Sequence, residues 1–201
     1  KFKFIFLKIK CSIQNKKKLA IHGIQRSGTN YLCEYLKIVG LIPINYPDKA
    51  RNNPTHKHCR WYPKKELIPL VIQSQYGNNF YAENINQLNM ICKYPPNTHH
   101  FVMIKEKKSW ILSILNWGMK CNWFSSKSNA LEYIKNFSDD YDAYYSFWRK
   151  MKSSDSQKIH FFDIKSIMND PISFNKFLME SFDLKKEPVF NGVFDYVPMS
   201  P

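Results

Sequence analysis

The sequence predicts an α/β protein in which helices flank a mainly parallel central sheet. Three short apolar runs, 19–22, 100–104 and 158–162, have the length and composition of buried strands. A segment with apolar residues at helical spacing follows each of them. Strands that alternate with helices are typical of a parallel sheet, because each helix carries the chain back to start the next strand.

The first half of the chain supports this pattern element by element. The first strand stops at Gly23, and helical spacing from Asn30 predicts a helix that closes at Gly40. Residues 43–63 have little periodicity and predict a long functional loop, whereas 67–72 fit a strand or a short helix equally well. The helix after the second strand is expected to be capped by Lys108 or Ser109.

The second half predicts three further helices. Residues 129–136 and 139–151 have helical spacing, and Asp170-Pro171 opens a last helix through Leu178, with proline in its first turn. Near one face, the helix 139–151 carries the aromatic residues Tyr141, Tyr144, Tyr145 and Trp148. Such a face is more typical of a core than of an exposed platform for sugars. We expect one domain over 1–201, with a basic N-terminal segment 1–17 and a C-terminal tail 185–201 whose completeness stays open.

The net charge indicates which kind of partner the protein binds, and the cysteines indicate its cellular compartment. The chain has 201 residues with 30 Lys and Arg against 16 Asp and Glu, so its net charge of +14 attracts anions. Only four cations are arginine, and we expect no dedicated nucleic-acid binding. Five scattered cysteines without C-x-x-C spacing indicate neither disulfides nor zinc, which favours a cytoplasmic location. The apolar part of residues 1–10 is too short to span a membrane, and an upstream signal or anchor stays open.

A glycine-rich segment between the first strand and the first helix predicts an anion site. Gly23 and Gly28 in GIQRSGTN satisfy the first six positions of the nucleotide-binding pattern G-x-x-x-x-G-K-[ST]. Thr29-Asn30 then stands where the lysine and the magnesium ligand belong. A turn that feeds a helix N-terminus still directs N–H groups at one point. The pattern therefore predicts phosphate binding without the usual lysine and metal, although an ordinary turn would fit the two glycines as well.

The string RSGTNYL after a buried strand resembles the 5'-phosphosulfate loop of the PAPS-dependent sulfotransferase family. The resemblance implies a three-layer P-loop-like fold, 3'-phosphoadenylyl sulfate (PAPS) as donor, 3',5'-ADP as product and no metal. It implies that Tyr31 stacks on the adenine. It also implies that the five residues before Tyr31 surround the 5'-phosphate: Arg26, Ser27, Gly28, Thr29 and Asn30. Cytosolic members commonly have lysine where this chain has Arg26.

Two further matches follow in the order that the family has. The family binds the 3'-phosphate with an arginine at a strand end and a serine eight residues later, which implies Lys105 and Ser113 here. Lysine supplies the charge without the bidentate fork of arginine. Residues 158–184 resemble the family's later strand, D-P turn and helix, with Lys165-Ser166 in place of its acidic pair. The family's C-terminal Arg-Lys-Gly element is not visible before Pro201.

The loop PTHKHCRW lies where many sulfotransferases carry a catalytic lysine and histidine. By that resemblance His58 is the general base, Lys57 steadies the sulfonate and Arg60 binds substrate, although a solvated basic loop is the alternative. Other candidates for the base are His56, Glu83 and Glu66. Of the remaining histidines, His22 is expected to pack at a strand end and His99 and His100 to enter the second strand, and none belongs to a metal site.

The resemblance implies an enzyme that transfers a sulfuryl group from PAPS to a hydroxyl acceptor, with a glycan as the expected acceptor. The first alternative is a P-loop nucleotide kinase or NTPase, against which the missing lysine and magnesium ligand argue. The second is a non-catalytic protein that binds polyanions through its +14 charge.

Overall fold

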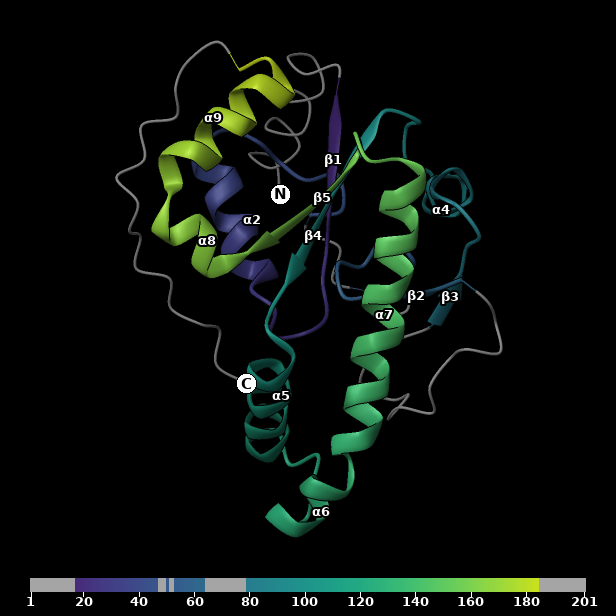
Figure 1. Cartoon of the computed structure of the whole chain (residues 1–201), viewed down its shortest axis with the longest axis vertical. Helices are drawn as coiled ribbons and strands as arrows, with labels where there is room; N and C mark the ends of the chain where they lie inside the picture. The colour runs from purple at the N-terminus through teal and green to yellow at the C-terminus, as the bar shows by residue number, and fades with distance from the viewer. Residues whose placement is uncertain (1–16, 47–49, 51–52, 64–78, 185–201) are drawn as a thin grey trace.

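The central sheet has three parallel strands. The computed structural model describes residues 17–46, 50, 53–63 and 79–184 (Figure 1). In these residues the sheet order is β1-β4-β5, formed by β1 (Lys18–His22), β4 (Thr98–Ile104) and β5 (Ile159–Asp163). His22 pairs with Val102 and Ile104 pairs with Asp163, so the three carboxyl ends meet at one edge of the sheet. The predicted strands and the α/β class are confirmed.

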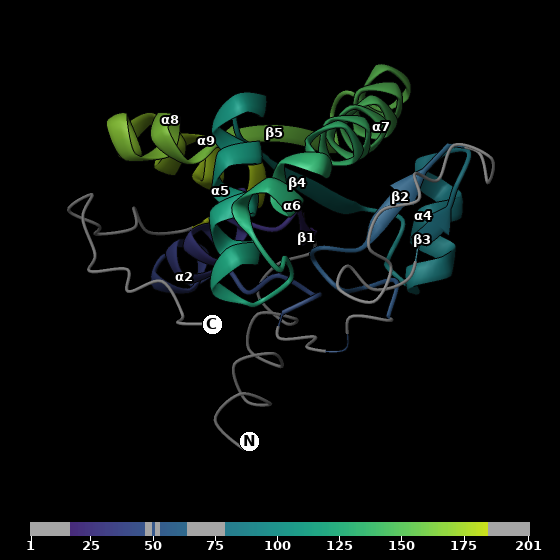
Figure 2. The same ribbon diagram turned by 90° about the horizontal axis from the view of Figure 1, so that it is seen from below.

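Helices cover both faces of this sheet. Figures 1 and 2 place three of them on one side, α2 (Thr29–Ile38), α8 (Ile164–Asn169) and α9 (Pro171–Phe182), and α7 (Ile134–Ser154) on the other. Residues of β1 alternate between these two layers, as the two-residue period of a strand requires. Leu19 and Ile21 pack in the core with α2 and α9, whereas Ala20 packs in the core with α7.

A second, two-stranded sheet lies beside α7, and it corrects the prediction of a loop over 43–63. Its parallel strands are β2 (Arg60–Tyr62) and β3 (Asn79–Tyr81), and α4 (Ile85–Cys92) follows them. All three residues of β2 are buried, and the strand packs against α7. A strand this short leaves no periodic pattern, which is why the sequence did not indicate it. Residues 67–72 and most of 1–17 lie outside the described residues.

Several helix boundaries differ from the predicted ones. α5 (Lys107–Lys120) is capped by Glu106, not by Lys108 or Ser109, because the Glu106 carboxylate accepts hydrogen bonds from the backbone N–H groups of both residues. α6 (Lys127–Glu132) and α7 are separated at Tyr133, earlier than expected. The predicted start of α9 is confirmed, with Asp170 as its N-cap.

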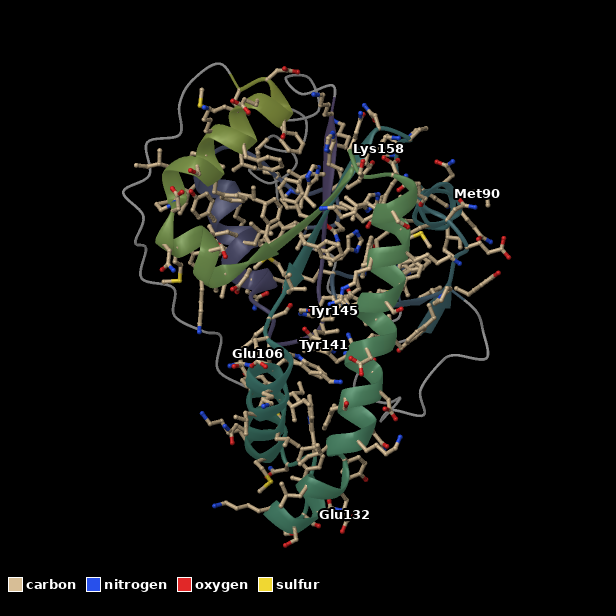
Figure 3. All side chains as sticks on the ribbon, in the orientation of Figure 1. Met90, Glu106, Glu132, Tyr141, Tyr145 and Lys158 are labelled. Carbon is tan, nitrogen blue, oxygen red and sulfur yellow. The ribbon has the colours of Figure 1, made fainter. Side chains whose placement is uncertain are left out.

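The aromatic face of α7 is core, as its spacing predicts. Tyr141, Tyr144, Tyr145 and Trp148 are all buried. Figure 3 shows Tyr141 and Tyr145 on the side of α7 that faces β4 and α5. The Tyr145 hydroxyl donates to the Met103 carbonyl at 2.8 Å, and the Tyr141 hydroxyl donates to the Lys105 carbonyl at 2.7 Å. These rings join α7 to the end of β4 and leave no exposed platform for a sugar.

Candidate functional site

The glycine loop, residues 23–30, connects the end of β1 to the start of α2. Gly28 has a φ of 97° and precedes the first turn of α2, which has no side-chain cap. Within the described part of the chain, the N–H groups of Thr29 and Asn30 have no hydrogen-bond partner. Unpaired N–H groups at the N-terminus of a ten-residue helix attract an anion, because the helix dipole adds to their partial charge.

Tight packing makes both glycines of the loop necessary. A Cβ on Gly23 would lie 2.6 Å from the Ser27 hydroxyl oxygen and 3.2 Å from Cβ of Met103. A Cβ on Gly28 would lie 3.2 Å from the Ile164 side chain. Ser27 is buried, and its hydroxyl donates to the Ile24 carbonyl at 2.6 Å. Ser27 therefore fixes the turn of the loop, and its hydroxyl already has an intramolecular partner.

The loop that carries Lys57 and His58 is bound to the glycine loop at three points. The Gly23 N–H donates to the Lys57 carbonyl at 3.0 Å, and Nδ1 of His58 lies 2.8 Å from the Gly23 carbonyl oxygen. The Lys57 ammonium donates to the side-chain oxygen of Asn30. The structure thus brings a lysine and a histidine to the anion-attracting end of α2, although more than twenty residues separate the two loops in the chain.

The contact with Gly23 selects one tautomer of His58. A carbonyl oxygen can only accept a hydrogen bond, so Nδ1 carries the hydrogen and Nε2 keeps its lone pair. Burial lowers the pKa of His58 well below its usual value, and the charge of Lys57 lowers it further. The imidazole is therefore neutral at pH 7. A neutral, half-buried histidine with a lone pair on Nε2 is suited to accept a proton.

A group of cations lies at the carboxyl edge of the sheet, next to the glycine loop. Burial lowers the pKa of Lys105, and the nearby positive charges of Arg26 and Lys165 lower it further. Asp163 is the opposing charge. Lys165 lies in the first turn of α8, two residues after the end of β5, and was not predicted as a binding residue, although its position after a predicted strand was a signal for it. This edge carries more positive charge than the resemblance alone implied.

Helix α5 packs against the glycine loop through two tryptophans. The Trp110 indole N–H donates to the Gln25 carbonyl at 2.6 Å, and the Arg26 guanidinium lies 4.6 Å from the centre of the Trp117 ring. Ser113 lies three residues after Trp110 and four before Trp117, so all three share the face of α5 that meets the loop. This placement is compatible with the predicted role of Ser113.

Two predicted roles disagree with the structure. Tyr31 is only 4% exposed and packs in the core beside Tyr35, which argues against stacking of an adenine on its ring. Arg60 is 1% exposed and its guanidinium is paired with Asp140, so the prediction that Arg60 binds substrate is wrong. In both cases a residue type common in ligand sites is used for internal packing instead.

The alternative bases differ in their surroundings. His56 is buried, and its Nδ1 accepts the backbone N–H of His58 at 3.2 Å. The Glu83 carboxylate accepts a hydrogen bond from the Tyr81 hydroxyl in the loop after β3, and none of the contacts between described residues joins it to the glycine loop. Glu66 lies outside the described residues. His58 differs from them in the hydrogen bond that its ring makes to the glycine loop, at Gly23.

Comparisons with known proteins add nothing to this geometry: no family model, no curated protein and no solved structure matches the chain. Among the described residues, no three His, Cys, Asp or Glu side chains are grouped so that they could hold a metal ion. No helix in the described ranges has the length and apolar character needed to cross a membrane.

Proposed function

We propose that this chain is a P-loop-like sulfotransferase, which transfers the sulfuryl group of PAPS to a hydroxyl of a carbohydrate acceptor. One observation carries the proposal. A neutral histidine, His58, is held by its Nδ1 against Gly23, the first residue of a loop suited to phosphate, and so keeps a lone pair on Nε2.

The donor's two phosphate positions correspond to two groups of residues. The 5'-phosphosulfate binds the free N–H groups at the start of α2, with Arg26 beside them. The 3'-phosphate binds Lys105, near Arg26 at the carboxyl edge of the sheet, and Ser113 on the adjacent face of α5. Lys165 adds a further positive charge at this edge. A nucleotide with both a 5'-phosphate and a 3'-phosphate should therefore bind more tightly than one with a 5'-phosphate alone.

The chemical step then needs one proton acceptor and one stabilised leaving group. The acceptor hydroxyl gives its proton to Nε2 of His58 as its oxygen bonds to the sulfur of PAPS. The bond between sulfur and the 5'-phosphate oxygen breaks, and its electron pair stays on the phosphate of 3',5'-ADP. Lys57, which is bound to Asn30, and Arg26 stabilise the charge that grows on that oxygen. The products are a sulfate ester and 3',5'-ADP, and His58 later releases the proton to water.

The proposal is tested by calorimetry with 3',5'-ADP and 5'-AMP in EDTA. Hydrogen bonds to charged groups contribute roughly 1.5–3 kcal/mol, so 3',5'-ADP should bind about 10- to 150-fold more tightly. Lys105→Ala should remove most of this difference, whereas Lys120→Ala, which removes an exposed lysine at the far end of α5, should leave it unchanged. Equal affinity for the two nucleotides in the wild type would contradict the assignment of Lys105 and Ser113.

Turnover distinguishes the alternatives. We expect transfer from PAPS to persist in EDTA, because Arg26, Lys57 and the loop N–H groups supply the positive potential. Loss of activity on chelation with rescue by Mg²⁺, together with phosphoryl transfer from ATP, would instead indicate a kinase. Salt-sensitive binding to heparin without any turnover of PAPS would indicate a polyanion-binding protein.

A further inference from the structure

A fully buried ion pair joins β2 to α7. Arg60 and Asp140 are each 1% exposed and lie 80 positions apart in the chain. Nε of Arg60 donates to Oδ1 of Asp140 at 3.0 Å, and Nη2 donates to Oδ2 at 2.9 Å. The Tyr62 hydroxyl also donates to Oδ1, at 3.1 Å. The carboxylate thus has both oxygens occupied, and the guanidinium lies over the Tyr144 ring.

The remaining arm of the guanidinium contacts the residue proposed as the base. Nη1 of Arg60 donates to the His58 backbone carbonyl at 3.1 Å. The same histidine has its ring fixed by Gly23 and its backbone N–H bound to Nδ1 of His56. His58 is therefore held at its N–H, its carbonyl and its ring. Arg60 and Asp140 provide the link from this residue to a long helix.

Helix α7 also contacts the donor side of the site. One turn of α7 carries Asp140, which binds Arg60, and Tyr141, which binds the Lys105 carbonyl at 2.7 Å. Adjacent residues of one helix are thus linked to His58, through Arg60, and to the proposed 3'-phosphate lysine directly. This arrangement sets the separation between the two, because a helix of 21 residues is a stiff element.

We infer that Arg60 and Asp140 are positioning residues, which hold the His58 backbone so that its ring keeps the bond to Gly23 and its Nε2 can act as a base; the catalytic part of this inference rests on the proposed function. Removing two charges from water is costly, and a buried pair often contributes little to net stability. Here the pair makes a specific hydrogen bond to the base, so its role is conformational.

The test compares Arg60→Lys with Tyr62→Phe. Lysine retains the charge opposite Asp140 but lacks the planar fork that reaches Asp140 and the His58 carbonyl together. Tyr62→Phe removes a hydrogen bond from the same carboxylate and does not touch His58. Asp140→Asn provides a second variant of the pair, with nearly the same shape, and thermal unfolding identifies any variant that is not folded.

The first measurement is the nitrogen and carbon NMR spectrum of the His58 ring, which reports its tautomer and pKa without any substrate. We expect the Nδ1–H tautomer in the wild type and Tyr62→Phe, and a tautomer mixture in Arg60→Lys and Asp140→Asn. In the PAPS assay, kcat should fall up to about 100-fold in these two variants with little change in the KM for PAPS, since small misplacements of a catalytic group have effects of this size.

The two hypotheses fail differently. A wild-type ring spectrum in folded Arg60→Lys and Asp140→Asn would overturn the positioning role, whatever the protein catalyses. An equal loss of kcat in Tyr62→Phe would also overturn it, because destabilisation alone would then explain the effect. A changed ring spectrum in the two pair variants supports the positioning role even if the wild type does not turn over PAPS, and only the proposed function would then be wrong.

Discussion

Nδ1 of His58 lies 2.8 Å from the carbonyl oxygen of Gly23, 35 positions earlier in the chain. The reciprocal bond from the Gly23 N–H to the Lys57 carbonyl, at 3.0 Å, joins the same two loops in the opposite direction. Together these bonds place a proton acceptor beside an anion site, and they suggest how to remove the acceptor while keeping the loops joined.

His58→Asn should strongly reduce turnover and leave nucleotide binding intact. The amide N–H of asparagine can occupy the place of Nδ1–H and keep the bond to Gly23, but nothing replaces Nε2. We expect kcat to fall by about 10²–10⁴-fold, with the affinity for 3',5'-ADP from calorimetry close to that of the wild type. If kcat survives in His58→Asn but is lost in His56→Asn or Glu83→Gln, the base is assigned to the wrong residue.

Arg26→Ala should impair binding and turnover together. Its charge meets the 5'-phosphate in the ground state and the leaving oxygen in the transition state, so both 3',5'-ADP affinity and kcat depend on it. The affinity should fall roughly 10- to 150-fold, as expected for a charged hydrogen bond. Arg149→Ala is the matched control, since it removes one exposed arginine from α7. Similar losses in both variants would mean that only the net charge of the protein matters.

The sheet and the glycine loop could be predicted because their signals are local. Apolar runs between polar segments indicate buried strands, and two glycines before a helical pattern indicate a loop at a helix N-terminus. The position of Lys165 in the group of cations could also have been predicted, because it follows a predicted strand at the edge of the sheet where the other cations lie. Parallel strands bring their carboxyl ends together, so that edge follows from the strand prediction alone.

The roles of Arg60 and Tyr31 could not be predicted, because they depend on tertiary contacts. The partner of Arg60 is Asp140, 80 positions away in a helix whose apolar pattern does not single it out. Tyr31 lies at helical spacing with core residues, but the same spacing fits an aromatic residue that borders a ligand site. The contact between His58 and Gly23 is also non-local, and the family resemblance was the one sign in the sequence that their two loops belong together.

Gly28→Ala and Gly40→Ala should both lower stability, Gly28→Ala by at least as much, and only Gly28→Ala should weaken nucleotide binding. Gly28 has a φ of 97° and Gly40 a φ of 84°, so alanine costs about 1–2 kcal/mol at either position. A Cβ on Gly28 also meets Ile164 and Met103 at 3.2–3.3 Å, whereas a Cβ on Gly40 has nothing within 4 Å. Urea unfolding measures the loss of stability in each variant. Calorimetry with 3',5'-ADP should show weaker binding for Gly28→Ala only, and unchanged binding in both would remove the anion site from this loop.

The last prediction concerns a buried histidine pair beneath the site. Nε2 of His22 lies 3.0 Å from Nδ1 of His100, and the His22 ring packs against Trp148. Burial lowers the pKa of His22 to about 3 and the pKa of His100 well below its usual value. Both rings are therefore neutral in the folded protein at any pH near neutrality, whereas in the unfolded chain they take up protons below a pH of about 6.5.

The protein should accordingly lose stability as the pH falls from about 6.5 toward 5, because the unfolded state binds protons that the folded state does not. For His22 alone the loss at pH 5 is about 2 kcal/mol, at roughly 1.4 kcal/mol per pH unit. Urea unfolding at pH 7, 6 and 5 measures this slope. His22→Gln should be less stable than the wild type at pH 7, because it loses the ring packing, but its stability should fall less steeply with acidification. The same slope in wild type and His22→Gln would show that His22 does not stay neutral in the folded state.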